Sequence, residues 1–369
     1  MNPSFVRPVC ALWALAAGMT PLHAQRWQMQ YLYDKNNSAL EINDLQFASP
    51  SRGVAVGFVA EGRRRQPTSL VTSDGGAHWQ IVRLKDAPLS LFFLNENAGW
   101  MVTVNGLWQT MEAGKSWSKL PKPPSRILRV YFADEKNGWA VGPRKVALET
   151  HDGGRRWTAI AAAAEQPGKP EYSVYNWIAF ASPQFGMMTG WNLPPRRGAL
   201  LPDWIDPEEA LSRRETPHLS YLLVTNDGGK TWKSSSASLF GDVTHVRFAG
   251  GIGLGLIEYS DSFRIPSEVY RIDWRTGKSM TFFKDKKYAI SDVWLAPDGT
   301  AYLAGLLQAG QLRHVVPGKV VVLKSKDYTS WAEMEVDYRA VANRAMLAAG
   351  DGRSLWLATD TGMILKLSQ

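Results

Sequence analysis

One stretch of the sequence could hold a phosphate group. Residues 225–232 read TNDGGKTW, and Gly229-Lys230-Thr231 matches the end of a loop whose backbone amides and lysine bind nucleotide phosphates. That loop needs another glycine five residues before Gly229, where this chain has Val224, and it needs a helix after it. Three similar stretches occur elsewhere in the chain, and each is followed by a strand-like apolar run and not by a helix. The sequence therefore disfavours a nucleotide site.

The stretch is one of four copies of the same frame. The others are TSDGGAHW (72–79), TMEAGKSW (110–117) and THDGGRRW (150–157). Each copy, which we call a box, begins with Thr and has an acid two residues later, Gly four residues later and Trp seven residues later. Gly accepts the positive φ of a sharp turn, the acid and the Thr hydroxyl can bind backbone groups, and Trp buries a large apolar face. We therefore predict structural roles for the acid and the Trp of each box: Asp74, Trp79, Glu112, Trp117, Asp152, Trp157, Asp227 and Trp232.

Two other segments could belong to a glycosidase. Phe263-Arg264-Ile265-Pro266 matches the motif that supplies a carboxylate-binding arginine in sialidases, but it follows the last full box, whereas sialidases place it ahead of their boxes. No motif places the Tyr nucleophile, its Glu partner or the Asp acid/base of that chemistry. The acidic run DPEEALSRR (206–214) could supply a carboxylate pair, yet a helix that starts at Asp206 explains it without catalysis. We expect no enzymatic activity.

Metal, thiol and cofactor chemistry find no support in the sequence. The only cysteine, Cys10, lies in the N-terminal leader, so a processed chain would have no thiol. The histidines after the leader have no metal-ligand spacing; they are His78, His151, His218, His245 and His314. We expect no metal and no cofactor.

A longer repeat surrounds each box. A Phe stands six residues before a Gly in four units, at Phe47, Phe93, Phe132 and Phe180, and each Gly opens a short apolar run. Each unit then predicts four strands, with the box in the last turn. Three weaker units follow: one at 243–284, one with a shortened box, SKDYTSW (325–331), and one with only three strands. Repeats of about 40 residues with four strands are typical of propeller blades. The sequence predicts an all-β, seven-bladed β-propeller whose last blade is closed by the N-terminal strand 26–34, beside 363–368.

These motifs resemble known propellers. The boxes are similar to the Asp-box, or bacterial neuraminidase repeat, of sialidases and xyloglucanases. The longer unit, clearest at 127–159, resembles the photosystem II stability and assembly factor family, over about 26–368. That resemblance implies a non-enzymatic propeller that holds a membrane-protein precursor through an arginine-rich patch, which no motif in this sequence locates.

The N-terminal segment predicts an exported protein. Residues 1–24, with Arg7 before an apolar run, resemble a cleaved signal peptide, and we expect the propeller to occupy 25–369 with a long loop insert at 191–219. No later apolar run is long enough for a transmembrane helix. The net charge of +8 favours acidic partners. We expect a periplasmic or secreted monomer that binds a client protein or membrane-protein complex and no nucleic acid.

Arginine-rich loops form the predicted binding face. In a four-stranded blade, the loop between the second and third strands lies at the end opposite the box. The arginines expected there are Arg63, Arg64, Arg65, Arg144, Arg196, Arg197, Arg213, Arg214, Arg264 and Arg313. Arginine suits an anionic client segment because its planar fork pairs with carboxylates. The sequence thus favours an assembly or stability factor for a membrane or envelope protein complex; the alternative is a divergent glycoside hydrolase of the sialidase or xyloglucanase type.

Overall fold

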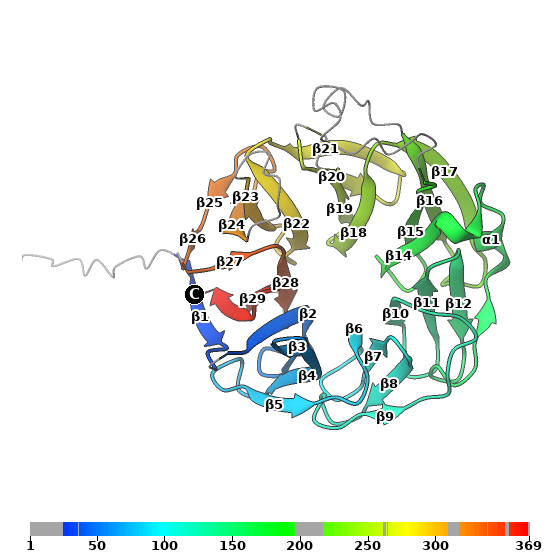
Figure 1. Ribbon diagram of the computed structural model, residues 1–369. Helices are drawn as coiled ribbons and strands as arrows, with labels where there is room; N and C mark the ends of the chain where they lie inside the picture. The colour runs from blue at the N-terminus through cyan, green and yellow to red at the C-terminus, as the bar shows by residue number, and fades with distance from the viewer. Residues whose placement is uncertain are drawn as a thin grey trace, which may run out of the picture.

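Seven antiparallel sheets stand around a central axis like the blades of a propeller (Figure 1). The computed structural model describes residues 25–35, 37–195, 217–260, 263, 265–308, 317–337, 339–350 and 354–367. The all-β, seven-bladed prediction is confirmed. Among the helices in these ranges, none has the length and apolar character needed to cross a bilayer.

Each of the first six blades is built from four consecutive strands, starting at the axis. Blade 1 contains β2 (Ala39–Phe47), β3 (Gly53–Glu61), β4 (Arg64–Thr72) and β5 (Gln80–Arg83). Blade 2 contains β6 (Pro88–Phe93), β7 (Gly99–Thr103), β8 (Gly106–Thr110) and β9 (Ser118–Lys119). Blade 3 contains β10 (Arg129–Phe132), β11 (Gly138–Gly142), β12 (Val146–Thr150) and β13 (Thr158–Ala159). Blade 4 contains β14 (Ser173–Phe180), β15 (Gly186–Asn192), β16 (His218–Thr225) and β17 (Lys233–Leu239). Blade 5 contains β18 (Asp242–Ala249), β19 (Ile252–Glu258), β20 (Ser267–Asp273) and β21 (Lys278–Lys284). Blade 6 contains β22 (Tyr288–Leu295), β23 (Ala301–Leu307), β24 (Gly318–Ser325) and β25 (Ala332–Glu333).

Blade 7 combines the two ends of the chain. It contains β28 (Ala345–Ala349), β29 (Leu355–Thr359), β30 (Met363–Leu367) and β1 (Arg26–Leu32), which pairs antiparallel with β30. The predicted N-terminal closure is confirmed. A short strand that the sequence did not predict, β26 (Glu335–Val336), pairs in parallel with the other edge of β1, and β27 (Val341–Ala342) pairs with β24.

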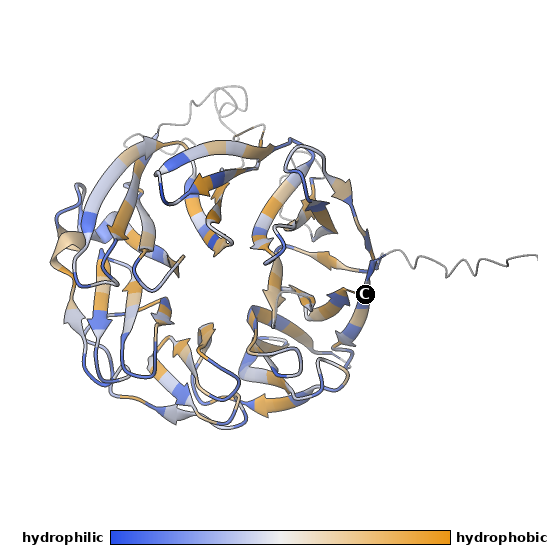
Figure 2. Ribbon diagram, turned by 180° about the vertical axis from the view of Figure 1, so that it is seen from behind, coloured by the Kyte–Doolittle hydropathy of each residue, from blue (hydrophilic) through white to orange (hydrophobic). Residues whose placement is uncertain are grey.

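The Phe and Gly of the repeat meet for a steric reason. A Cβ atom on Gly53 would lie 2.5 Å from the Phe47 ring, and one on Gly138 would lie 2.4 Å from the Phe132 ring, so only glycine fits beside these rings. Each Phe also packs on the preceding blade: Trp100 of blade 2 stacks on Phe132 of blade 3 with ring centroids 3.7 Å apart. The repeat therefore builds the apolar contacts between blades. Figure 2 shows apolar residues along the strands and hydrophilic residues in the connecting loops.

The boxes form tight turns between the third and fourth strands. Gly75 and Gly76 have φ of 72° and 90°, which confirms the predicted positive-φ turn. The Thr72 hydroxyl accepts a hydrogen bond from the Gly76 amide at 3.0 Å, and the Asp74 carboxylate accepts one from the His78 amide at 2.9 Å. The shortened box of blade 6 uses the same chemistry, since Asp327 accepts the Ser330 amide at 2.8 Å.

Helix is confined to one connection in the described ranges. The link between blades 3 and 4 contains α1 (Ala161–Ala164) and the 3-10 turn η1 (Pro170–Tyr172). The predicted signal peptide, 1–24, and the predicted helix start at Asp206 lie outside the described residues, as does 196–216 of the predicted insert.

Candidate functional site

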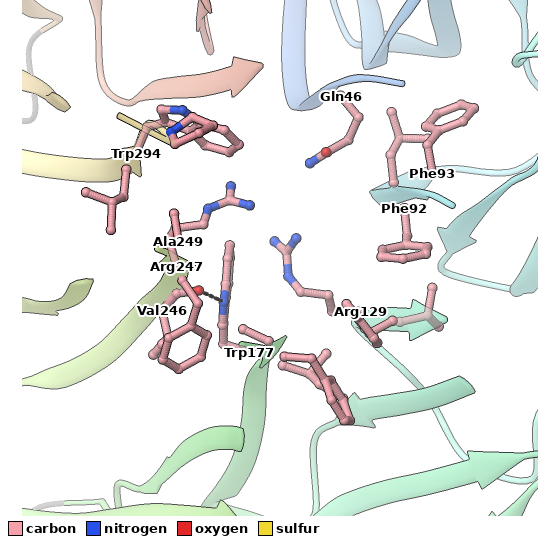
Figure 3. A pocket seen from close by; sticks show the side chains of 18 residues that line it. Gln46, Phe92, Phe93, Arg129, Trp177, Val246, Arg247, Ala249 and Trp294 are labelled. Atoms are coloured by element: carbon pink, nitrogen blue, oxygen red, sulfur yellow. Dashed lines mark hydrogen bonds between the residues drawn. The ribbon is translucent and has the colours of Figure 1, made fainter. Parts of the chain in front are cut away.

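A cavity of about 360 Å³ lies on the propeller axis, and we call it the axial pocket (Figure 3). The inner strands of blades 1 to 6 line it. The ends of these strands and the turns that follow them, at Ala249 and Pro297, also contribute, so the pocket lies toward the end of the axis where the box turns lie. Its polar and aromatic side chains include Gln46, Phe92, Arg129, Trp177, Arg247 and Trp294.

Two arginines enclose a tryptophan in this pocket. The Arg129 guanidinium lies 4.0 Å from the ring centroid of Trp177, and that of Arg247 lies 5.1 Å from it. Arg247 also lies 5.5 Å from the Trp294 ring. The Trp177 indole donates a hydrogen bond to the Val246 carbonyl at 2.8 Å, which fixes its plane (Figure 3). Cation–π contacts thus hold both guanidinium groups against the indole rings that line the pocket.

Two buried carboxylates lie near these arginines: Asp44 beside Arg129, and Asp292, whose charge interacts with those of Arg129 and Arg247. Asp44 lies 3.8 Å from Arg129, but its two oxygens already accept the Leu45 amide at 2.9 Å and the Leu91 amide at 2.8 Å. The Nε atom of Arg247 is buried and has no hydrogen-bond partner in the described part of the chain. Burial lowers the pKa of Arg129, with Asp44 opposing the shift. An anion bound here would offset the lost solvation of the guanidinium groups.

A third arginine approaches the axis beside a buried histidine. The His245 ring lies 4.3 Å from the Trp177 ring, and its Nε2 atom lies 3.3 Å from Nη2 of Arg344. Burial, followed by the charges of Arg344, Arg247 and Arg129, holds the pKa of His245 well below its usual value. The imidazole is therefore neutral, accepts the Arg344 hydrogen bond and adds no charge of its own.

The axial pocket lacks the acids of a glycosidase. None of the described residues that line it is Asp or Glu. A Tyr–Glu pair does occur in blade 5, where the Tyr270 hydroxyl donates to Glu268 at 2.7 Å, but Lys284 also pairs with that carboxylate. Burial and the Glu268 contacts raise the pKa of Tyr270, which is the wrong direction for a nucleophile.

The predicted arginines lie elsewhere. Arg63 occupies the turn between β3 and β4, and Arg64 and Arg65 begin β4, at the end of blade 1 opposite its box. Arg65 pairs with Glu41, and Arg144 lies 3.3 Å from Glu171. The axial pocket contains none of these four. The remaining predicted arginines lie outside the described residues: Arg196, Arg197, Arg213, Arg214, Arg264 and Arg313. Their role as a binding face stays a prediction.

The box residues occupy the turns as positioned above and do not line the axial pocket. In the described ranges, no group of three or more His, Cys, Asp or Glu side chains could hold a metal ion.

Sequence reasoning missed the pocket residues, although the repeat contains a signal for them. Arg247 and Trp294 stand one residue before the position equivalent to the repeat Phe, and Arg129 and Trp177 stand three residues before it. An alignment of the units on their Phe would have shown that these four residues share the inner strands of neighbouring blades.

Comparisons with known proteins found one curated relative over part of the chain and several solved propellers of similar fold. No family model matches the chain. The photosystem II assembly lipoprotein Ycf48 of Synechococcus sp. (strain CC9902) is 21% identical over 187 residues, 49% of this chain and 46% of that protein, so the match spans about half the length of this relative. A structure of YCF48 bound to D1 peptide aligns over 91% of this chain and 98% of its own at 15% identity, with a TM-score of 0.58. A GH74 xyloglucanase from Xanthomonas campestris aligns over 92% of this chain and 53% of its own at 11% identity, with a TM-score of 0.60.

The class defined by fold and site is a seven-bladed β-propeller with a cationic, tryptophan-lined axis. The weak sequence match and the shared fold fit a photosystem II assembly factor-like propeller family, as the sequence resemblance predicted.

Proposed function

We propose that this protein is an exported, non-enzymatic assembly or stability factor that binds an anionic segment of a client membrane or envelope protein in the axial pocket. The observation that carries the proposal is the Arg129–Trp177–Arg247 arrangement, in which two guanidinium groups face one cavity that no described acidic side chain lines. The similarity to Ycf48 supports an assembly role.

The dimensions and chemistry of the pocket suit part of a peptide. A volume of about 360 Å³ is at the small end of ligand sites and would admit one or two side chains. Guanidinium groups bind carboxylates through paired hydrogen bonds, and the exposed faces of Phe92 and Trp294 would pack against an apolar or aromatic neighbour. A related propeller, YCF48, has been solved with D1 peptide bound.

Two further features belong to this proposal. Residues 1–24 would direct the chain to the periplasm or to the outside of the cell and would then be removed. The boxes would act as Asp-box, or bacterial neuraminidase repeat, turns that stabilise the blades without touching the client.

A glycoside hydrolase is the second candidate, favoured by the fold shared with a GH74 xyloglucanase. Its chemistry requires two carboxylates across the scissile bond. Because the described lining of the axial pocket offers arginines and aromatics in their place, binding without hydrolysis is the better supported function.

The test compares two sets of arginines. Arg247→Gln removes a charge from the axial pocket, and Arg63→Ala with Arg64→Ala and Arg65→Ala removes the predicted loop cluster at the opposite end. Client proteins would be captured from envelope extract with the wild type at low and high salt, identified by mass spectrometry and then titrated. Hydrogen bonds to charged groups contribute about 1.5–3 kcal/mol, so Arg247→Gln should weaken binding roughly ten- to a hundredfold and reduce its salt sensitivity.

Equal client binding by wild type and Arg247→Gln, with loss in the loop variant, would move the site to the arginine loops. Hydrolysis of xyloglucan or of a fluorogenic sialoside by the wild-type protein, abolished by a single carboxylate substitution, would replace the proposal with the enzymatic one.

A further inference from the structure

A second cavity, of about 180 Å³, lies between blades 1 and 2, and we call it the rim groove. One side is formed by β5 and the residues after it, and the other by β8 and the box turn of blade 2. Met101, Trp108 and Leu84 contribute buried apolar surface, and Trp117 and Val82 are half-buried beside them. The groove is therefore separate from the axial pocket and shares no residue with it.

Polar contacts hold the Trp108 ring in place. The Trp108 indole donates a hydrogen bond to Asp86 at 3.0 Å, and Lys119 binds the same carboxylate oxygen at 2.8 Å. Lys119 also lies 5.4 Å from the Trp108 ring. These contacts fix an aromatic wall in advance, which lowers the entropy cost of binding a ligand against it.

The rim of the groove has a single sign of charge. Arg83, Lys85 and Lys115 line it and are exposed, and none of the described lining residues is acidic. In contrast with Lys119 and its Asp86 partner, these three cations make no ion pair with any described residue. An apolar floor with an uncompensated cationic rim is complementary to an acidic segment that carries an apolar side chain.

A comparison with another blade indicates that folding does not require these charges. Leu84 and Ile160 occupy equivalent places, since each amide donates to the third strand of its own blade, to Pro67 at 2.9 Å and to Ala147 at 3.0 Å. The neighbours of Ile160 that correspond to Arg83 and Lys85 are Ala159 and Ala161. The propeller thus accepts small, uncharged residues at this place between blades 3 and 4.

The backbone beside the groove is also open to a partner. The strand order in blade 1 is β2-β3-β4-β5, so β5 is an edge strand whose outer backbone groups have no strand partner among the described residues. An extended peptide can add to such an edge through main-chain hydrogen bonds while alternate side chains enter adjacent pockets.

We propose that the rim groove is a second protein-binding site, which takes an extended partner segment with one large apolar side chain flanked by acidic residues. The apolar side chain packs on the half-buried Trp117 and Val82, with Trp108 beside them. The flanking carboxylates pair with Arg83, Lys85 and Lys115. This site is independent of the axial pocket, so the protein can hold a client at two points or hold two partners at once.

The test is a peptide-display selection on the full mature chain, followed by titration of the enriched peptides in synthetic form. Lys85→Glu with Lys115→Glu reverses the rim charge. The matched control is Lys230→Glu with Lys278→Glu, because Lys230 occupies the same box position as Lys115 but lies in blade 4, and both control side chains are exposed. Arg247→Gln tests the axial pocket separately.

The selection should enrich peptides in which acidic residues flank a large apolar residue. Their affinity should fall about tenfold or more in the Lys85/Lys115 variant and should be unchanged in the control and in Arg247→Gln. Replacement of the apolar residue by Ser should also abolish binding. Absence of such peptides, or equal loss in both double variants, would falsify the proposal. Two other outcomes would also overturn the proposal, because they assign the groove to another occupant. The wild type could bind no such peptide but dimerise with rising concentration, or bind phosphatidylglycerol vesicles, and the Lys85/Lys115 variant could lose that property.

Discussion

Single residues in the boxes act on the stability of the turns. The hydrogen bond from the Arg156 side chain, followed by that from the Arg156 backbone, lowers the pKa of Asp152 to about 2. The backbone and side chain of His78 do the same for Asp74, and the side chain and backbone of Thr231 for Asp227, again to about 2. Three different residues lower the carboxylate pKa in the same way, because the turn brings the residue just before the box Trp into hydrogen-bond distance of the carboxylate.

This chemistry predicts how stability depends on pH. A carboxylate with a depressed pKa in the folded state stabilises the protein above its unfolded pKa, near 3.9, and loses that contribution as the pH falls through about 2. Asp152→Ala should therefore lower the melting temperature by a few degrees at pH 7, and the difference from the wild type should shrink steadily between about pH 4 and pH 2. Thermal denaturation followed by circular dichroism across this range measures both effects.

Client binding provides the control for this variant. At a temperature where Asp152→Ala is folded, client affinity should equal that of the wild type, because the box does not line the axial pocket. A variant with unchanged melting temperature but impaired binding would assign the box a direct role in recognition.

At the scale of the strands, one position in the repeat holds either an acid that links two blades or a side chain that lines the axial pocket. Three residues before the repeat Phe position, Asp44 in blade 1 and Asp292 in blade 6 each accept an amide of the next blade's inner strand, from Leu91 and Leu347. Trp177, at the same position in blade 4, also links to the next blade, through the Val246 carbonyl. Blade 3 has Arg129 there. In blades 3 and 4, the axial pocket is therefore lined by arginine and tryptophan at the position that holds a linking acid in blades 1 and 6.

The linking acids allow a prediction at this scale. Asp292 is buried and accepts the Val293 and Leu347 amides, both at 2.8 Å. Asp292→Ala leaves these buried donors without an acceptor, which costs about 1–3 kcal/mol per group, so the urea midpoint should fall clearly. The exposed Asp34→Ala is the matched control and should change stability little. Similar midpoints for the two variants would show that the inner-strand link adds no stability.

The sequence predicted the blades better than the site for a physical reason. Blades 1 to 4 contain the same Phe, Gly and box Trp, so their packing repeats and can be recognised from spacing. The pocket arises where the units differ, as at Arg129 and Arg247, and each of these residues alone is consistent with an exposed strand position. Only the closed ring brings blades 3, 4, 5 and 6 to one axis, and that convergence has no local signal in the sequence.

Closure of the whole ring depends on a strand from the far end of the chain. β1 lies between β30 and β26, so it is hydrogen-bonded on both edges, with Trp27 opposite Leu367 on one side and Val336 on the other. The Trp27 side chain is only 2% exposed and belongs to the core cluster shared by blades 6 and 7. Because this pairing leaves no exposed sheet edge at the seam of the ring, we expect its loss to destabilise the propeller as a whole.

Trp27→Ala should therefore weaken the molecule as a whole. Removal of a buried tryptophan costs about 3–5 kcal/mol, and here the cavity opens at the seam of the ring. We expect a large fall in melting temperature and faster proteolysis that begins in blade 7, measured by thermal denaturation and by mass spectrometry of limited digests. Leu32→Ala lies in the same strand, is 43% exposed and should have little effect on either readout. If Trp27→Ala melts with the wild type, or if its first cleavages fall in blades 2 to 5, then closure by β1 does not limit the stability of the propeller.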